Sequence, residues 1–344
     1  VSALDLGHFF HRGLEEFYYY LKTHDLEHGE LSAAELKEIV DKIVVELAPV
    51  MQNKIFYSTA RYRYLINKLA RILLRAVIVL GEHHRRSNFR PWGVEISFGK
   101  QAAWSGLNLQ IGQTKVEVVG RIDRVDLAES EGNVYVRVID YKSGELGLNL
   151  EEIYYGLKLQ LPIYLLVALQ EISQKLKRVT EPAGMFYFPV KDPLINTRGP
   201  LDKQNLEQEI LKNLKLRGYL LENLPVVKLM DQEISGYSEL LHVAINKKGE
   251  FYRNQKNVLN EKAWKALISY AESLVKKISK EILSGKIGVQ PYYYRGHKPC
   301  NYCPYPAVCG FDPLLPGYSY RYLWSKTTAE IWSQISQETG EENE

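Results

Sequence analysis

Two neighbouring runs of alternating apolar residues constrain the fold of this chain most strongly. The runs "VEVVGRIDRVDL" (116–127) and "VYVRVIDYK" (134–142) are separated by a short Gly-containing stretch, "ESEGN". Alternation with a period of two predicts β-strands, and the short connection predicts an antiparallel hairpin. Asp140 and Lys142 continue the apolar face of the second strand, where an acid and a base are costly to bury without a functional reason.

Helices and further short strands surround this hairpin in the sequence. Short apolar runs predict strands at 93–98, 107–111 and 183–190, and helical periodicity predicts helices at 3–22, 151–170, 202–221 and 260–283. Two more helices are predicted, one opening with a Ser32–Glu35 capping box and stopping before Pro49, the other running from about 58 to 82. Pro162 should kink or interrupt the helix at 151–170. These elements predict an α/β core with helical additions and no linker that requires two domains.

Composition limits the class of protein. Of the 344 residues, 45% are hydrophobic and 25% are charged, which describes a globular chain with an ample core. No stretch approaches about eighteen apolar residues, so neither a membrane-spanning helix nor a membrane partner is expected. The net charge of +3 is compatible with nucleic acid as a partner. The chain begins with Val1, which we interpret as the start of a piece of a longer polypeptide, and a polar tail at 333–344 is expected to be disordered.

The acids of the hairpin indicate a metal site. Asp123 and Asp140 can lie side by side in such a hairpin, and two carboxylates that close repel each other unless a cation separates them. Lys142 would place an ammonium group beside whatever the cation holds. This combination suits phosphodiester hydrolysis, in which a metal ion polarises the phosphoryl group and activates water. The alternative is an ordinary ion pair between Asp140 and Lys142, with Asp123 on the surface.

Four motifs in a fixed order extend this site to a family resemblance. They are "GHFFHRGLEEF" (7–17), "GRIDRVD" (120–126), "VIDYKSG" (138–144) and "QLPIY" (160–164). Together they resemble the RecB-like branch of the PD-(D/E)XK nuclease superfamily, in which a helical histidine precedes a G-x-x-D-R-x-D strand, a D-Y-K strand and a Q-x-x-x-Y helix. The resemblance implies a restriction-endonuclease-like core over residues 1–332, with a central mixed sheet flanked by helices, and a magnesium-dependent DNA exonuclease or deoxyribonuclease activity.

The same resemblance implies a role for each matching residue. The groups that would hold Mg²⁺ or Mn²⁺ are the side chains of His11, Asp123 and Asp140 and the backbone carbonyl of Tyr141. Lys142 would be catalytic, and Gln160 and Tyr164, four residues apart on one helix face, would orient Lys142 or the DNA.

Other interpretations of single residues stay open at this point. His11 could be a core histidine, and Gln160 and Tyr164 could pack at a helix kink. Glu95 is a possible additional acid, although an outward or pairing role is favoured for it. Asp126 is assigned a structural role, because it lies on the opposite strand face from Asp123.

A cysteine loop at 297–312 carries the second chemical feature. Cys300, Cys303 and Cys309 follow a C-x₂-C-x₅-C pattern and are the only cysteines of the chain, which predicts a metal or cluster site. The spacing resembles the iron–sulfur clasp of AddB-type helicase–nuclease subunits, which implies a [4Fe–4S] cluster whose fourth cysteine lies outside this sequence. The alternative is a Zn²⁺ site completed by His297.

The resemblance also implies partners and a setting. An AddB-type subunit would pair with an AddA-type helicase–nuclease subunit, act on DNA double-strand breaks and work in the bacterial cytoplasm. This chain has no G-x-x-x-x-G-K-[ST] phosphate loop, so it is not expected to be the ATP motor. Two alternatives are a non-catalytic DNA-binding or scaffold module with a structural metal loop, and a stand-alone RecB-like exonuclease of the kind used in CRISPR adaptation.

Overall fold

The computed structural model describes residues 3–50, 60–144, 147–197 and 199–340. It divides into two compact units. The first contains Val1–Leu107, Glu117–Leu148 and Leu161–Trp264, and the second contains Asn108–Val116, Asn149–Gln160 and Lys265–Glu344.

A mixed six-stranded sheet forms the centre of the first unit. Its strands are β1 (Arg90–Phe98), β4 (Gly120–Ser130), β5 (Asn133–Lys142), β6 (Thr180–Pro189), β7 (Arg217–Leu221) and β8 (Val258–Leu259), in the order β1-β4-β5-β6-β7-β8. The pairs β1/β4, β4/β5 and β6/β7 are antiparallel, whereas β5/β6 and β7/β8 are parallel. The predicted hairpin is therefore confirmed as β4 and β5, within the predicted mixed sheet.

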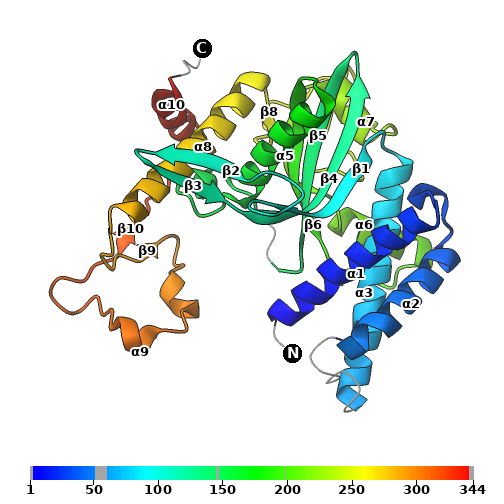
Figure 1. The fold of residues 1–344 in the computed structure, drawn as a ribbon. Helices are drawn as coiled ribbons and strands as arrows, with labels where there is room; N and C mark the ends of the chain where they lie inside the picture. Colours follow the sequence, from blue (N-terminus) through cyan, green and yellow to red (C-terminus); the bar gives the residue numbers. More distant parts are fainter. Residues whose placement is uncertain (1–2, 51–59, 145–146, 198, 341–344) are drawn as a thin grey trace. The chain divides into compact units, whose positions relative to one another are not determined.

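Helices cover both faces of this sheet (Figure 1). They are α1 (Ala3–Thr23), α2 (Ala33–Val50), α3 (Ala60–Arg85), α5 (Gln160–Leu176), α6 (Lys203–Asn213) and α7 (Leu224–Met230). The first three pack against one another, and on their side of the sheet Arg124 of β4 reaches the Tyr18 hydroxyl of α1. Tyr164 of α5 packs edge-on against Phe98 of β1, with ring centroids 5.9 Å apart.

Several helix boundaries differ from the prediction. The Ser32–Glu35 capping box is confirmed, since the Ser32 backbone nitrogen donates to Glu35 at 2.8 Å and the Glu35 nitrogen donates to the Ser32 hydroxyl at 3.3 Å. Its helix α2 nevertheless includes Pro49, because a proline in the last turn costs only one backbone bond. The predicted third helix starts at residue 60, and residues 58 and 59 lie outside the described ranges.

The single helix predicted at 151–170 is wrong. Two helices, α4 (Leu150–Tyr154) and α5, occupy this stretch, with a break between them. Pro162 is the third residue of α5, where its missing N–H removes no intrahelical bond, so it does not kink the helix.

The strand predicted at 116–127 and the helix predicted at 202–221 are each two separate elements in the structure. Residues 114–118 form β3 and residues 120–130 form β4, on either side of Val119. Helix α6 ends at Asn213, and residues 217–221 form strand β7 instead. Gly218 permits this pairing, because a Cβ there would lie 1.9 Å from the Met185 carbonyl oxygen of β6.

The second unit is built from small pieces. It contains most of the two-stranded sheet β2 (Leu107–Ile111) and β3 (Thr114–Val118), helix α4, most of α8 (Glu261–Leu283), the parallel pair β9 (Tyr292–Tyr293) and β10 (Arg321–Tyr322), α9 (Pro306–Cys309) and α10 (Thr328–Thr339). Residues 333–339, expected in a disordered tail, form the end of α10, which a Thr327–Glu330 capping box starts and the buried Ile331 and Ile335 anchor. Residues 341–344 of that tail lie outside the described ranges. No helix in the described ranges is long and apolar enough to cross a membrane.

Candidate metal centre

The β4–β5 hairpin brings two acids together at the end of its ladder. The register pairs Arg124 with Ile139, so Asp123 and Asp140 stand opposite each other on neighbouring strands. Both are buried, with exposed fractions of 5% and 1%. The Tyr141 backbone nitrogen donates to Asp123 Oδ2 at 2.7 Å, which fixes the orientation of that carboxylate. The side-by-side arrangement expected from the sequence is therefore present.

Strand β1 adds a third acid to this row. The pairs Val94–Arg124 and Ile96–Ile122 place Glu95 opposite Asp123 on the other side of β4. Glu95 has a φ of +47°, in the left-handed region that a non-glycine residue rarely adopts within a strand. Such strain persists only where the surroundings enforce it, and it is concentrated at functional sites.

Of the outward or pairing role favoured for Glu95 from the sequence, the outward orientation is wrong and the pairing is present. Its side chain is 6% exposed and points inward, with Arg121 at 3.6 Å from Oε2 and the imidazole of His11 at Oε1. The β1/β4 register puts Glu95 on the face of Asp123, but the sequence alone does not reveal which strand pairs with β4 on this side. An acid inside an otherwise apolar strand was the available sequence feature.

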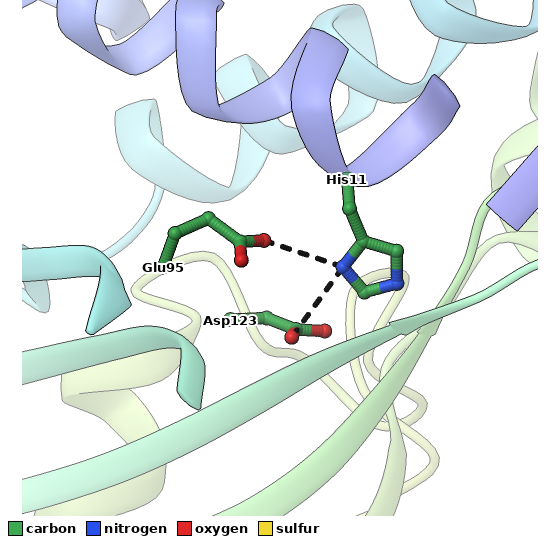
Figure 2. Close-up of side chains that lie close together, drawn as sticks. All are labelled: His11, Glu95 and Asp123. Carbon is green, nitrogen blue, oxygen red and sulfur yellow. Dashed lines mark hydrogen bonds and ion pairs between the residues drawn. The ribbon is translucent and has the colours of Figure 1, made fainter. Parts of the chain in front are cut away.

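His11 of α1 completes a cluster of three metal-ligand side chains. Its Nδ1 lies 3.3 Å from Glu95 Oε1 and 3.4 Å from Asp123 Oδ1, as Figure 2 shows. One ligand atom from each of the three residues lies within 4.8 Å of the other two. Burial alone would lower the pKa of His11, but the hydrogen bonds and charges of Asp123 and Glu95 outweigh it and raise the pKa to about 10. The site is thus arranged to hold positive charge between two carboxylates.

Asp140 and Lys142 form an ion pair beside this cluster. Lys142 Nζ lies 2.6 Å from Asp140 Oδ2 and 5.6 Å from the centre of the Tyr187 ring. Both Asp140 oxygens are buried, and within the described ranges neither has a hydrogen-bond partner apart from this ion pair. Burial, and next the charge of Asp123, raise the pKa of Asp140 to about 7 against the opposing effect of Lys142. A carboxylate in this state would be stabilised by a cation.

The burial of Glu95 has the same electrostatic effect. Burial raises the pKa of Glu95, and the charge of Asp123 adds to the shift, while the hydrogen bond from His11 opposes it. Glu95, Asp123 and Asp140 therefore lie close together at one end of the sheet, and a bound cation would reduce the repulsion between their carboxylates. Oxygen and imidazole donors of this kind suit a hard divalent cation.

The other predicted site residues are Tyr141, Gln160 and Tyr164. The Tyr141 ring packs edge-on to the His11 ring, with centroids 6.1 Å apart. Gln160 is the first residue of α5 and is half-buried, and Tyr164, one turn later, packs on Phe98. Neither Gln160 nor Tyr164 belongs to the three-residue cluster.

A second charged network lies on the opposite face of the hairpin. Asp126 accepts a hydrogen bond from Arg124 Nε at 2.6 Å and lies 2.8 Å from Arg137 Nη2, and all three side chains are at most 1% exposed. The structural role assigned to Asp126 from its strand face agrees with this position. The network stiffens the two strands that carry Asp123 and Asp140.

The cysteines of the loop at 297–312 are not gathered in the same way. Cys300 is half-buried, Cys303 and Cys309 are exposed, and all three are free thiols. In the described part of the chain, the three sulfur atoms and His297 are not gathered into a set of donors within 4.8 Å of one another.

The base of this loop is nevertheless anchored. Glu151 of α4 is buried and accepts hydrogen bonds from the Tyr294 hydroxyl at 2.5 Å, from Arg295 at 2.6 Å and from the Lys326 backbone nitrogen at 2.6 Å. One carboxylate thus holds both ends of the segment that contains the cysteines.

Comparisons with known proteins place this geometry in context. A family model described as the PD-(D/E)XK nuclease superfamily matches residues 1–310. The chain is 43% identical over 345 residues to the B-type subunit of an ATP-dependent helicase/deoxyribonuclease from Desulforamulus reducens, covering 100% of this chain and 30% of the relative. It is 40% identical to the subunit of the same name from Moorella thermoacetica, over 97% of this chain and 30% of the relative. The chain therefore spans about 30% of the length of the curated relatives that it matches.

Proposed function

Because this chain belongs to the PD-(D/E)XK nuclease superfamily, we propose that it hydrolyses DNA phosphodiester bonds with a divalent metal ion. The observation that carries the proposal is the convergence of His11, Glu95 and Asp123, from three separate segments, next to the Asp140–Lys142 pair. A purely structural module would have no reason to keep three acids in one buried row at this cost in electrostatic energy.

The donor set fits Mg²⁺ or Mn²⁺. His11, Asp123, Asp140 and the carbonyl of Tyr141 would hold the ion, and Glu95 would add a further oxygen ligand or orient His11. The buried Asp140 oxygens and the strongly raised pKa of His11 support a cation at this position. When bound, the ion would polarise the phosphoryl group and lower the pKa of a water molecule.

The protein's own side chains would position the reacting groups. The Tyr141 amide holds Asp123, and Asp140 directs the Lys142 ammonium. Lys142 would place the attacking water and offset the charge that develops on the phosphate oxygens. Gln160 and Tyr164 would orient Lys142 or the DNA strand from the first two turns of α5.

The matching relatives suggest the wider setting. We propose that residues 1–332 form the nuclease domain of an AddB-type subunit, paired with an AddA-type helicase–nuclease subunit during double-strand break processing. Such a complex would act in the bacterial cytoplasm, where chromosomal DNA lies.

The cysteine loop would hold a cluster in the assembled protein. Cys300, Cys303 and Cys309 would bind a [4Fe–4S] cluster together with a fourth cysteine from outside this sequence, and the alternative is Zn²⁺ with His297. Broad absorbance near about 400 nm would identify the cluster, because Zn²⁺ is colourless. Glu151 supports either site by holding the two ends of the loop.

Cleavage of linear DNA in the presence and absence of Mg²⁺ tests the nuclease assignment. Asp140→Ala and Lys142→Ala should each lower the cleavage rate by about 100-fold or more, because each removes a group that acts on the transition state. Lys100→Ala, on an exposed turn, is the matched control and should leave the rate unchanged. Cleavage that persists in the Asp140 or Lys142 variant, or in EDTA, would refute the assigned roles.

A further inference from the structure

A pocket outside the metal centre lies beside strand β7. It has a volume of about 320 Å³, and its lining includes Lys215, Tyr237, His242 and Tyr252. This volume is at the lower end of the range for small-molecule sites, about 300–1,000 Å³. It suits a ligand the size of one nucleotide, and it is far too small for a duplex.

Arg217, two residues after Lys215, is unusual among the arginines of the chain. It is half-buried, its Nε is fully buried without a hydrogen-bond partner, and in the described ranges its guanidinium contacts no carboxylate. Every other buried or half-buried arginine that the structure describes is paired with an acid, namely Arg75, Arg86, Arg124, Arg137 and Arg178. A half-buried guanidinium without a counter-charge is costly, so an external anion would stabilise it.

Arg217 and the pocket share one cationic patch. Lys215 and His242 both line the pocket, and Arg217 follows Lys215 by two residues at the start of β7. Burial, and next the positive charges of Arg217 and Lys215, lower the pKa of His242 to about 4. Among the described residues the Lys215 ammonium has one hydrogen-bond acceptor, the Ser238 carbonyl oxygen, and two of its three donors remain for a ligand.

The sheet connects this patch to the metal centre. Asp140 of β5 pairs with Tyr187 of β6, and Tyr187 pairs with Arg217 of β7, so the three residues form one row across adjacent strands. Side chains in one row of a sheet point to the same face. Two strand spacings of about 4.8 Å separate the backbones of Asp140 and Arg217, or roughly 10 Å. Phosphates along a stacked strand are about 3.4 Å apart along the axis, so this distance corresponds to a few nucleotides.

Two exposed tyrosines and a rigid floor complete the pocket. Tyr237 is 79% exposed and Tyr252 is 45% exposed, which leaves aromatic faces available for stacking. The side-chain amide of Gln255 bonds both the nitrogen and the carbonyl of Ala244, at 2.6 and 2.7 Å, and fixes the pocket wall. The Ser238 hydroxyl donates to the buried Asp231, which also accepts a hydrogen bond from the Arg86 guanidinium.

We propose that this pocket, together with Arg217, binds one nucleotide of a single DNA strand whose phosphate a few positions away lies at the metal centre. Arg217 and Lys215 would bind the nucleotide's phosphate, and Tyr237 and Tyr252 would stack on its base. We call this the β7 subsite (Lys215, Arg217, Tyr237, His242 and Tyr252). The proposal rests on the proposed nuclease function for its substrate. It goes further by assigning a strand-binding position that would set the path of the DNA.

Binding in the absence of metal tests the β7 subsite separately from cleavage. The anisotropy of fluorescein-labelled (dT)₁₂ is followed with the 344-residue protein in EDTA, over a series of salt concentrations. Arg217→Gln should weaken binding and reduce the slope of log K against log salt by about 0.7, as expected for one lost phosphate contact on a single strand. Tyr237→Ser should raise Kd about fivefold or more through lost stacking, and Tyr237→Phe should restore it. Lys37→Gln, exposed on α2, is the charge-matched control.

The outcomes separate the two proposals. An unchanged Kd in Tyr237→Ser, or an unchanged Kd and salt slope in folded Arg217→Gln, would overturn the β7 subsite even if the protein cleaves DNA. Binding of free dTMP as tightly as (dT)₁₂ would overturn the assignment to a strand. Weaker binding in these variants, in a protein that does not cleave DNA with Mg²⁺, would refute the nuclease function and leave the subsite standing. Tyr237 is so exposed that its variants retain the fold, so the test decides even if Arg217→Gln is unstable.

Discussion

Replacing Asp140 with Asn should stabilise the metal-free protein while it abolishes cleavage. The pKa of Asp140 is raised from its ordinary value of 3.8 to about 7, mainly by burial and next by the charge of Asp123. Since a tenfold change in a protonation equilibrium is about 1.4 kcal/mol, the ionised carboxylate destabilises the fold by about 4 kcal/mol. Asn keeps the shape and removes the charge. Lys142, the lost partner, is 33% exposed, so water can solvate its ammonium group.

The destabilisation by the ionised Asp140 carboxylate depends on pH. The folded protein binds a proton at Asp140 more tightly than the unfolded chain does, so the destabilisation is complete above pH 7 and decreases as the pH falls toward 3.8. Asp140→Asn should therefore raise the melting temperature by about 6 °C at pH 8 in EDTA. The difference between the two proteins should disappear near pH 4.

Thermal unfolding measured with and without metal provides the assay. Saturating Mg²⁺ should stabilise the original protein, by about 2.7 kcal/mol at one hundred times Kd, and have little effect on the variant. Asp41→Asn, which removes an exposed acid on α2, is the control and should change stability by less than about 0.5 kcal/mol. If Asp140→Asn lowers the melting temperature at pH 8 in EDTA, the electrostatic account of this site is wrong.

Three further predictions concern other buried groups. Asp126→Asn should cost about 3–5 kcal/mol in urea unfolding, because it leaves Arg124 and Arg137 buried without a carboxylate, and a loss below about 1 kcal/mol would contradict this. Glu151→Ala should release the cysteine loop, so that limited chymotrypsin digestion cuts after Tyr302 and Phe311 faster than in the original protein, and equal rates would show that the loop is held elsewhere. Burial lowers the pKa of His28 from 6.5 to about 3, so the free energy of unfolding should fall as the pH drops from 6.5 toward 3. His28→Gln should reduce the slope of unfolding free energy against pH in this range, measured by acid titration. An unchanged slope would exclude His28 as its source.

The parts of the site that follow regular strand geometry could be predicted from the sequence. The short turn and the two alternating runs determine that Asp123 and Asp140 face each other, because antiparallel pairing from a tight connection leaves little freedom of register. Asp126 could be separated from the site by the same alternation. The place of His11 came from the family resemblance and not from its helix, since any residue on that helix face would satisfy the helical pattern.

The parts that depend on irregular backbone or distant packing could not be predicted. Glu95 meets His11 because β1 pairs with β4 and α1 packs beside them, and no local pattern signals either contact or the left-handed backbone of Glu95. Strand β7 has a helix-like sequence before it, and its pairing with β6 depends on the close approach at Gly218. Helix α10 has polar residues on most positions, and its order depends on the burial of Ile331 and Ile335. Each of these features is determined by contacts far away in the sequence.

The two faces of the hairpin explain how a strained acidic row can persist in a stable fold. On one face burial and the charge of Asp123 disfavour the ionised forms of Glu95 and Asp140, and on the other Asp126 binds two buried arginines from strands β4 and β5. Since alternate residues of one strand belong to opposite faces, the arginine network holds the backbone that keeps the acids close. Loss of this network should therefore weaken metal binding as well as stability. Asp126→Asn protein that remains folded should need a higher Mg²⁺ concentration for half-maximal cleavage, although Asp126 itself touches no ligand of the metal centre.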